Sequence, residues 1–300
     1  MKFNFKIQPY QTDAVESIVG VFAGQPKFDE TSDNTIYARD FWKKVKTVSK
    51  EEIQALQLHF NDLGDSIDVS DAEEQLDAAG YRNADIVLSD QQLLENINTI
   101  QAQQNIYKSS KLFSDIGRVS LDVEMETGTG KTYVYVKTMF ELNKQYGWSK
   151  FIVVVPSIAI REGVKKSMEM TVEHFMEHYG KKARFFIYNS SNLNALDKFS
   201  SDAGINVMII NTQAFATSMK KDAKNKESRI IYSKRDEFNS RRPIDVIKVN
   251  RPIVILDEPQ KMGGAATQTG IKNFNPLFLI NYSADRKSTR LNSSHQIIAY

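Results

Sequence analysis

A single stretch decides the fold of this chain: Met125-Glu126-Thr127-Gly128-Thr129-Gly130-Lys131-Thr132. Before it, residues 119–125 predict a buried strand, and after it, residues 132–144 predict a helix. Two glycines at such a junction let the backbone turn so that successive N–H groups face one point. The positive end of the helix dipole faces the same point, so the pattern predicts a phosphate-binding loop.

The side chains of this loop indicate nucleotide chemistry. Lys131 is expected to reach the β- and γ-phosphates of ATP, and the Thr132 hydroxyl is expected to ligate Mg²⁺. Four loop residues are expected to surround the phosphates: Thr127, Gly128, Thr129 and Gly130. The loop departs from the G-x-x-x-x-G-K-[ST] pattern, because Met125 stands at the first glycine position. A glycine-rich turn that binds no phosphate is the alternative.

Short apolar strands alternate with helical patterns on both sides of the loop. Further strands are expected at 151–155, 185–188, 207–210, 253–256 and 277–281, and further helices at 160–178 and 212–220. Strands that are apolar throughout and separated by helices are typical of a parallel sheet covered on both faces. The sequence therefore predicts an α/β fold.

An acidic pair follows one of these strands. Asp257 and Glu258 come directly after residues 253–256. Asp257 is expected to hold Mg²⁺, and Glu258 is expected to activate the water that attacks the γ-phosphate. Alone, Asp-Glu before proline is a common turn, but beside a phosphate loop it favours a catalytic interpretation.

Composition excludes several classes of protein. The 300 residues include no cysteine, which excludes disulfides, thiolate metal sites and cysteine nucleophiles and suits a reducing cytoplasm. No apolar run approaches the roughly 20 residues that span a bilayer, and the N-terminus lacks the apolar core of a signal peptide. We therefore expect a cytoplasmic protein with no membrane partner.

Charge and pattern divide the chain into regions. We expect an N-terminal helix in residues 1–28, an acidic, mostly helical insertion at 29–110, the nucleotide-binding domain at 111–284 and a non-native tail at 285–300. Within the domain, residues 216–250 form a basic insertion. The acidic region would repel a phosphate backbone, whereas the basic one is suited to neutralising phosphates. A solvated charged surface is the alternative for the basic segment.

Several stretches together resemble one family. The loop at 125–132, Glu141-Leu142-Asn143-Lys144, residues 151–164 and Asp257-Glu258-Pro259-Gln260 resemble the Res subunit of type III restriction enzymes, within the superfamily-2 helicases and translocases. The resemblance implies a RecA-like domain of a DNA-dependent ATPase and translocase, a hydrolase. It also implies DNA and a modification (methyltransferase) subunit as partners.

The resemblance also implies roles for particular residues. Gln11, within Gln8-Pro9-Tyr10-Gln11, matches a glutamine that recognises adenine. Two segments match motifs that contact the DNA backbone: Pro156-Ser157 and Asn211-Thr212-Gln213. Without the family, these would be a strand-ending turn and a helix cap. Ser283 and Ala284 match the start of a motif that couples hydrolysis to movement, but Asp285 stands where threonine is expected.

Two other patterns favour ordinary structural interpretations. Residues 174–178 spell H-x-x-E-H, an inverted zinc-peptidase signature, but the sequence nominates no third zinc ligand. An exposed helix face is the simpler interpretation. The aromatic stretch at 184–188 favours a core strand over a base-stacking platform, because it lacks the RNP pattern.

Residues 285–295 look like the in-frame translation of a DNA-sequencing adapter, and a genuine basic C-terminus is the alternative. We expect the natural reading frame to continue past Ala284 into a second RecA-like domain and a nuclease domain, and the fragment alone to be nearly inactive. The rivals are another superfamily-2 helicase or translocase without a nuclease, and a non-catalytic nucleotide-dependent DNA-binding module.

Overall fold

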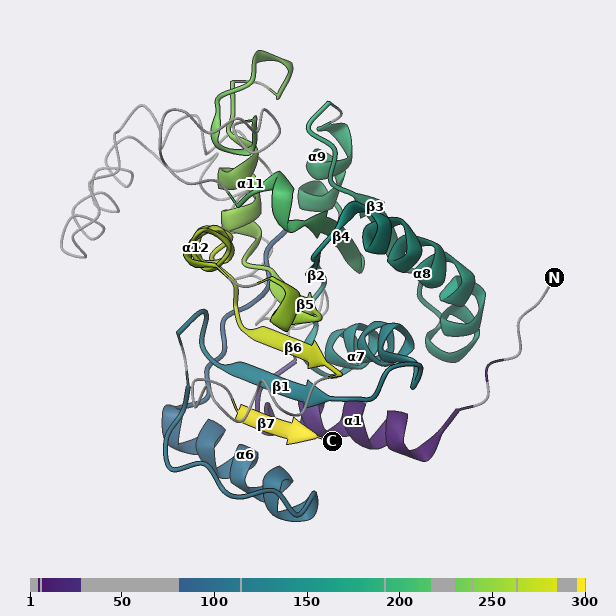
Figure 1. Cartoon of the computed structure of the whole chain (residues 1–300), viewed down its shortest axis with the longest axis vertical. Helices are drawn as coiled ribbons and strands as arrows, with labels where there is room; N and C mark the ends of the chain where they lie inside the picture. The colour runs from purple at the N-terminus through teal and green to yellow at the C-terminus, as the bar shows by residue number, and fades with distance from the viewer. Residues whose placement is uncertain are drawn as a thin grey trace.

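The computed structural model describes residues 5, 7–27, 81–113, 115–191, 193–216, 230–238, 240–262, 264–284 and 296–299. These residues build a sheet of seven strands in the order β3-β4-β2-β5-β6-β1-β7 (Figure 1). The strands are β1 (Ser120–Glu124), β2 (Lys150–Val155), β3 (Arg184–Ile187), β4 (Asn206–Asn211), β5 (Ile253–Asp257), β6 (Leu279–Ser283) and β7 (Gln296–Ala299). Every pair of neighbouring strands runs parallel.

Helices lie on both faces of the sheet (Figure 1). The α-helices are α1 (Pro9–Gly20), α6 (Asp90–Gln103), α7 (Lys131–Tyr146), α8 (Ile158–Tyr179), α9 (Asn194–Ser201), α11 (Pro243–Asn250) and α12 (Ala265–Asn273). Short 3-10 helices are η1 (Thr212–Ala214), η2 (Asp236–Phe238) and η3 (Pro259–Lys261). The core on one face lies under α1, α6, α7 and α8, and the core on the other lies under α9, α11 and α12.

The alternation of side chains along each strand explains the two cores. In β2, Val153 belongs to the first core and Val154 to the second, and both are fully buried. A parallel sheet buried on both faces needs apolar residues at consecutive positions, which is the pattern of β2, β4 and β5. The expected α/β arrangement, with a parallel sheet and helices on both faces, is confirmed.

The helix expected at 212–220 is wrong as far as its residues are described. After β4 the chain makes only η1, and Phe215 leaves the helical path with φ −135°. The Phe215 ring packs against the ring of Phe274, with 4.9 Å between centroids. It also fills the space beside Gly270, where an added Cβ would lie 2.4 Å from it. Burial of the Phe215 ring therefore outweighs continuation of the helix; residues 217–220 lie outside the described residues.

Three of these α-helices were not expected from the sequence: α9, α11 and α12. The helix α9 has only eight residues, and it buries Leu196 and Phe199 in the second core. The helix α12 is rich in alanine, threonine and glycine, and of its apolar side chains Ile271 reaches the core. Such short helices carry too few apolar positions to show a clear helical period, and packing against the sheet stabilises them.

The expected acidic insertion is described only in its last part. Residues 28–80 lie outside the described residues, whereas residues 81–110 include α6. Ser89 and Gln92 form a capping box at the start of this helix, and Leu93 and Ile97 are fully buried in the first core. The part of the insertion that is described thus packs against the sheet domain.

The C-terminal strand β7 adds an edge to the sheet. It pairs in parallel with β1, in a register that joins Leu121 to Gln296. Residues 285–295 lie outside the described residues. The non-native origin of residues 285–300 stays a prediction, because a short apolar segment is able to pair with an open strand edge whatever its source. Among the described helices, none combines the length and apolarity that crossing a bilayer requires.

Candidate functional site

The predicted phosphate loop connects the end of β1 to the start of α7. Gly128 and Gly130 both adopt left-handed conformations, with φ of 84° and 87°. An added Cβ on Gly128 would meet nothing within 4 Å, whereas one on Gly130 would lie 2.7 Å from Nε2 of Gln11. The first glycine therefore meets a conformational need, and the second also allows a close approach of α1.

Lys131 is the first residue of α7, and its side chain folds back over the loop. Its Nζ donates to the carbonyl oxygens of Met125, at 3.3 Å, and Glu126, at 3.4 Å. Thr129 closes the turn, since its Oγ1 donates to the Glu126 carbonyl oxygen at 2.6 Å. The loop thus presents its lysine ammonium at the N-terminus of a helix, where anions bind favourably.

Asp257 lies at the carboxyl end of β5 and is buried. Burial raises the pKa of its carboxyl to about 6, and the charge of Glu258 adds to that rise. The ammonium groups of Lys131 and Lys261 act in the opposite direction and lower this pKa. Lys131 and Asp257 therefore act on each other electrostatically, although 126 positions separate them in the sequence.

Glu258 adopts a backbone conformation that is unusual for a residue other than glycine. Its φ of 62° and ψ of 58° lie in the left-handed region, which costs about 1 kcal/mol or more for a residue other than glycine. The Glu258 amide donates to the Tyr282 carbonyl oxygen at 2.9 Å, which fixes the turn. Its carboxylate pairs with Lys261 at 2.6 Å. Local strain of this kind often accompanies a functional site.

The end of β6 links the loop to the acidic pair. The Ser283 carbonyl oxygen accepts from the Met125 amide at 2.8 Å, while the preceding Tyr282 carbonyl holds Glu258. The Ser283 hydroxyl lies 3.3 Å from Oε1 of Gln260 and donates to it. Ser283, expected in coupling, thus contacts both halves of the site, and Ala284 follows it half-buried.

The N-terminal helix supplies two side chains to the loop. Gln11 Nε2 donates to the Thr129 carbonyl oxygen at 2.9 Å, and the Tyr10 hydroxyl donates to the same oxygen at 3.1 Å. The sequence indicated Gln11 as a site residue but not Tyr10. The only feature of the sequence that could have indicated Tyr10 is its position next to Gln11. Both residues are placed by the packing of α1 against α7.

The family model for "Type III restriction enzyme, res subunit" matches residues 71–286. The chain belongs to this Res family. The match includes the loop, the acidic pair and the end of β6, which the geometry brings together, and it ends within the segment that follows Ala284.

Curated relatives agree with the family model. The chain is 30% identical over 215 residues to the EcoP15I Res subunit of Escherichia coli, covering 67% of this chain and 22% of the relative. It is 31% identical over 233 residues to the EcoPI Res subunit of Escherichia phage P1, covering 72% of this chain and 24% of the relative. The chain therefore spans less than a quarter of the length of these relatives.

Among solved structures, the UvsW helicase from bacteriophage T4 is similar with a TM-score of 0.37 and 10% sequence identity. The similarity covers 79% of this chain and 69% of the helicase chain.

The two segments expected to contact DNA end neighbouring strands of this Res domain. Pro156 and Ser157 follow β2, while Asn211 is the last residue of β4 and Thr212 and Gln213 open η1. Val155 and Asn211 are paired in the register of β2 and β4. Asn211 is the N-cap residue of η1 by position, but its side chain makes no capping hydrogen bond. Gln213 is exposed, whereas Asn211 is buried.

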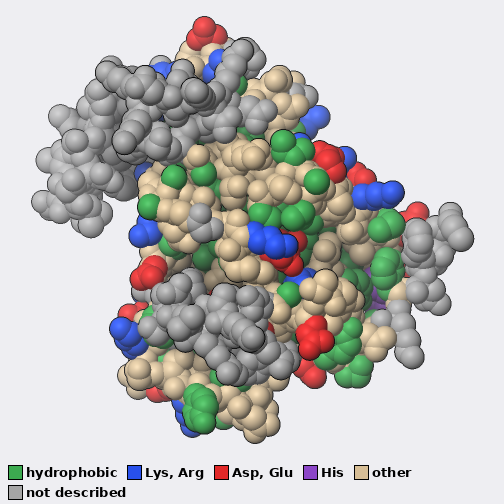
Figure 2. All heavy atoms as spheres, in the orientation of Figure 1, with side chains coloured by type: hydrophobic (Ala, Val, Ile, Leu, Met, Phe, Trp, Pro, Cys, Tyr) green, Lys and Arg blue, Asp and Glu red, His purple; other side chains and the backbone are tan. Residues whose placement is uncertain are grey.

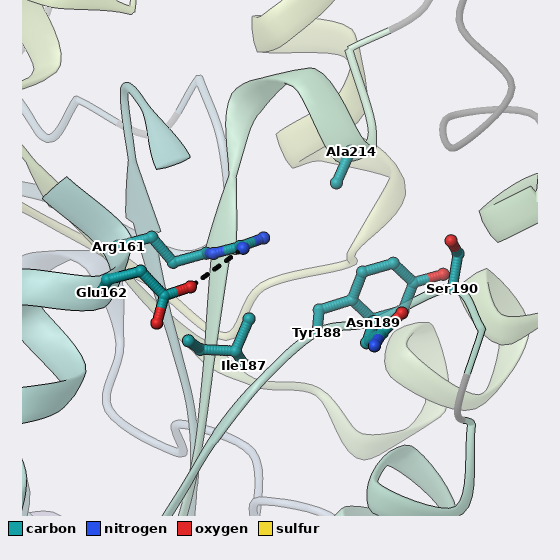
Figure 3. Close-up of a pocket in the computed structure, with 7 residues that line it drawn as sticks. All are labelled: Arg161, Glu162, Ile187, Tyr188, Asn189, Ser190 and Ala214. Atoms are coloured by element: carbon teal, nitrogen blue, oxygen red, sulfur yellow. Dashed lines mark hydrogen bonds and ion pairs between the residues drawn. The ribbon is translucent and has the colours of Figure 1, made fainter. Parts of the chain in front are cut away.

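A cavity of about 410 Å³ lies at the carboxyl ends of β3 and β4, beside these segments. Its lining residues are Arg161, Glu162, Ile187, Tyr188, Asn189, Ser190 and Ala214 (Figure 3). The sequence nominated none of them as site residues, because their spacing matches no binding pattern on its own. Arg161 and Glu162 nevertheless lie within the stretch at 151–164 that carried the family resemblance.

The described part of the basic insertion contains arginines with structural partners. Arg241 pairs with Asp197 at 3.0 Å, and its guanidinium lies 4.4 Å from the centroid of the Phe238 ring. Arg242 pairs with Asp245 at 2.6 Å. On the face seen in Figure 2, basic and acidic side chains are interspersed. Residues 217–229, with several of the expected cations, lie outside the described residues.

The remaining patterns occupy ordinary structural places. The Nε2 atom of His174 lies 3.0 Å from the Tyr133 hydroxyl oxygen and shares a hydrogen bond with it. The ring centroids of His174 and His178 are 4.3 Å apart. Across the described residues, no group of three or more His, Cys, Asp or Glu side chains is arranged to hold a metal ion. The aromatic stretch forms β3, which is a half-buried edge strand and not the expected core strand, and its Phe186 packs against Phe199.

Proposed function

We propose that this chain is the ATP-binding motor domain of a type III Res subunit, a hydrolase that uses ATP and Mg²⁺. One relationship carries the proposal: the end of β6 holds both the phosphate loop, through Met125, and the acidic pair, through Glu258. The charge of Lys131 acts on Asp257 across this junction. A cation after β1 and a carboxylate at the end of β5, on either side of β6, are suited to a nucleotide phosphate and its metal ion.

The residues present fit that ligand. The open space beside Gly128 leaves room for a phosphate against the loop backbone, and the helix N-terminus of α7 favours its charge. Lys131 would bind the phosphates, while Thr132 and Asp257 would hold Mg²⁺. The metal, when bound, neutralises phosphate charge. The Glu258 carboxylate would orient the attacking water and accept its proton. Gln11 would recognise adenine from its place beside Thr129.

We further propose that the whole protein is a DNA-dependent ATPase and translocase of a restriction system. The relatives are Res subunits of type III restriction-modification enzymes, and they are about four times longer than the matched region. DNA and a modification subunit are therefore the proposed partners, the cytoplasm is the proposed location, and the nuclease is proposed to lie outside these 300 residues. DNA would lie along Pro156, Ser157, Thr212 and Gln213, and the buried Asn211 would support the last two from beneath.

Family membership favours this function over its two rivals. A helicase or translocase without a nuclease would share the site but belongs to other families. A non-catalytic nucleotide-dependent DNA-binding module would bind ATP without hydrolysing it, so turnover by the whole protein separates it from a motor. The acidic pair favours the motor, since nucleotide binding alone needs no group to activate water.

The direct test is nucleotide binding by the chain. A fluorescent ATP analogue should bind and be displaced by unlabelled ATP, and Mg²⁺ should strengthen the binding. Lys131→Ala should lower the affinity at least tenfold, because its ammonium lies against the loop carbonyls of Met125 and Glu126, where the phosphates are proposed to bind. Lys144→Ala is the matched control, since Lys144 lies exposed near the far end of the same helix. Equal affinity of the two variants would contradict the assignment.

A further inference from the structure

The two segments that we expect to contact DNA are tied to each other by their own polar side chains. The Thr212 hydroxyl donates to the Pro156 carbonyl oxygen at 3.3 Å. The Ser157 hydroxyl accepts from the Ile160 amide at 3.4 Å and so caps the start of α8. Both hydroxyls therefore hold backbone in place.

Arg161 makes a second link between the same segments. It extends from the first turns of α8, and its Nη1 donates to Oδ1 of Asn211 at 3.1 Å. Its Nη2 donates to Glu162 at 3.1 Å, and Figure 3 shows the two side chains together at the cavity. Only 18% of the Arg161 side chain is exposed, so the guanidinium lies mostly within the protein.

The bond from Arg161 matters because Asn211 is buried. Only 1% of Asn211 is exposed, and no described group accepts a hydrogen bond from its Nδ2. Loss of Arg161 would leave the side-chain amide of Asn211 without a hydrogen-bond partner, which is unfavourable for a buried polar group. The end of β4 would relieve that cost by moving, and Thr212 and Gln213 would move with it.

We propose that Arg161 is a positioning residue for nucleic-acid binding: it fixes the end of β4 against the start of α8 and thereby aligns the two DNA-contacting segments. The inference rests on the proposed function and deepens its DNA-binding part. Arg161 acts through Asn211 and not as a phosphate ligand, because the neighbouring Glu162 carboxylate balances its charge.

A double-mutant cycle tests this role in the 300-residue chain. Binding of a duplex DNA oligonucleotide is measured by fluorescence anisotropy over a range of salt concentrations. Arg161→Met and Asn211→Ala should each weaken binding about tenfold, and the double variant should also lose only about tenfold, because both changes break one link. Arg161→Lys should recover at least part of the loss, since one donor can still reach Oδ1.

Salt dependence separates positioning from direct contact. Arg161→Met should leave the slope of log affinity against log salt unchanged, whereas loss of a phosphate contact lowers its magnitude by about 0.9. The charge-matched control is Lys165→Met on the same helix, where Lys165 pairs with Glu169 at 3.0 Å. This control should bind DNA within about twofold of the unaltered chain.

The outcomes are distinct. Unchanged affinity of Arg161→Met, a hundredfold loss in the double variant, a reduced salt slope or no recovery in Arg161→Lys would each overturn the positioning role alone. Unchanged nucleotide affinity in each variant confirms that it is folded; should Asn211→Ala fail to fold, the comparison of Arg161→Met with Arg161→Lys and the salt slope still decide. Absence of DNA binding by the unaltered chain would overturn the DNA-binding part of the proposed function and this inference with it.

Discussion

A side chain on Gly130 would collide with Gln11, because an added Cβ would lie 2.7 Å from the Gln11 Nε2. Gly128 has nearly the same φ, but its surroundings are open. Substitution of Gly128 by alanine therefore measures the cost of a left-handed backbone alone. The same substitution at Gly130 adds the cost of displacing a neighbouring side chain.

Gly128→Ala should lower the free energy of unfolding by about 1 kcal/mol, the cost of a left-handed alanine. Gly130→Ala should cost more, about 2 kcal/mol or above, because it also displaces Gln11 from Thr129. Denaturant unfolding measures both changes, and binding of an ATP analogue should fall further in Gly130→Ala. Equal destabilisation by the two substitutions would show that the approach of Gln11 is not close in solution.

Glu258→Gln should separate nucleotide binding from hydrolysis. The amide keeps the shape of the side chain, but it does not accept a proton from water as a carboxylate does. In the full-length parent protein, ATP turnover should fall by about two orders of magnitude or more while nucleotide affinity stays near that of the unaltered protein. Unchanged turnover would place the general base elsewhere.

Residues 1–284 alone should bind ATP weakly and hydrolyse almost none of it. In superfamily-2 motors, which the sequence resembles, a second RecA-like domain supplies arginines to the γ-phosphate. An arginine of this kind raises the rate of hydrolysis by a factor of about 10³ to 10⁵. Turnover is to be measured beside the full-length parent, with and without duplex DNA. DNA-stimulated turnover by the fragment within about tenfold of the parent would mean that these residues form a complete catalytic site.

The stability of the chain should depend on pH through Lys150. This side chain is fully buried at the start of β2, and its Nζ donates to the carbonyl oxygens of Phe199 and Asp202. Burial lowers the pKa of Lys150, the charge of Asp202 raises it and the charge of Arg184 lowers it, so that the pKa falls from 10.5 to about 7. A neutral amine keeps two N–H donors, which is enough for the two carbonyls.

The sign of the effect follows from proton binding. Below pH 7 Lys150 is charged in the folded and the unfolded chain, so the full cost of burying the charge is present. Between pH 7 and 10.5 only the unfolded chain keeps the proton, and the cost falls as pH rises. The unaltered chain should therefore gain stability relative to Lys150→Met by up to about 1.4 kcal/mol per pH unit from about pH 7 to 9. A constant difference in unfolding free energy would contradict this.

Local sequence was enough to predict the glycine turn before Lys131 and the place of Asp257 at the end of a buried strand. Glycines before Lys131 predict a tight turn, and an apolar run before Asp257 predicts a buried strand. Both patterns depend only on residues a few positions apart in the chain. The parallel sheet was also predicted from these strands. Consecutive apolar residues in a strand face both sides of the sheet, so both sides must be buried. The short helices α9, α11 and α12 were not predicted, since their stability comes from packing against the sheet.

Sequence alone therefore determined the fold class and predicted the phosphate loop and the acidic pair, whereas the tertiary structure decided which distant residues meet. Strand order placed β6 between β1 and β5, so that Tyr282 and Ser283 hold both halves of the site. The same sheet put Arg161 beside Asn211, which no spacing in the chain indicates. The physical reason is that a motif reports backbone conformation over a few residues, while contacts between strand ends depend on the order and register of the whole sheet.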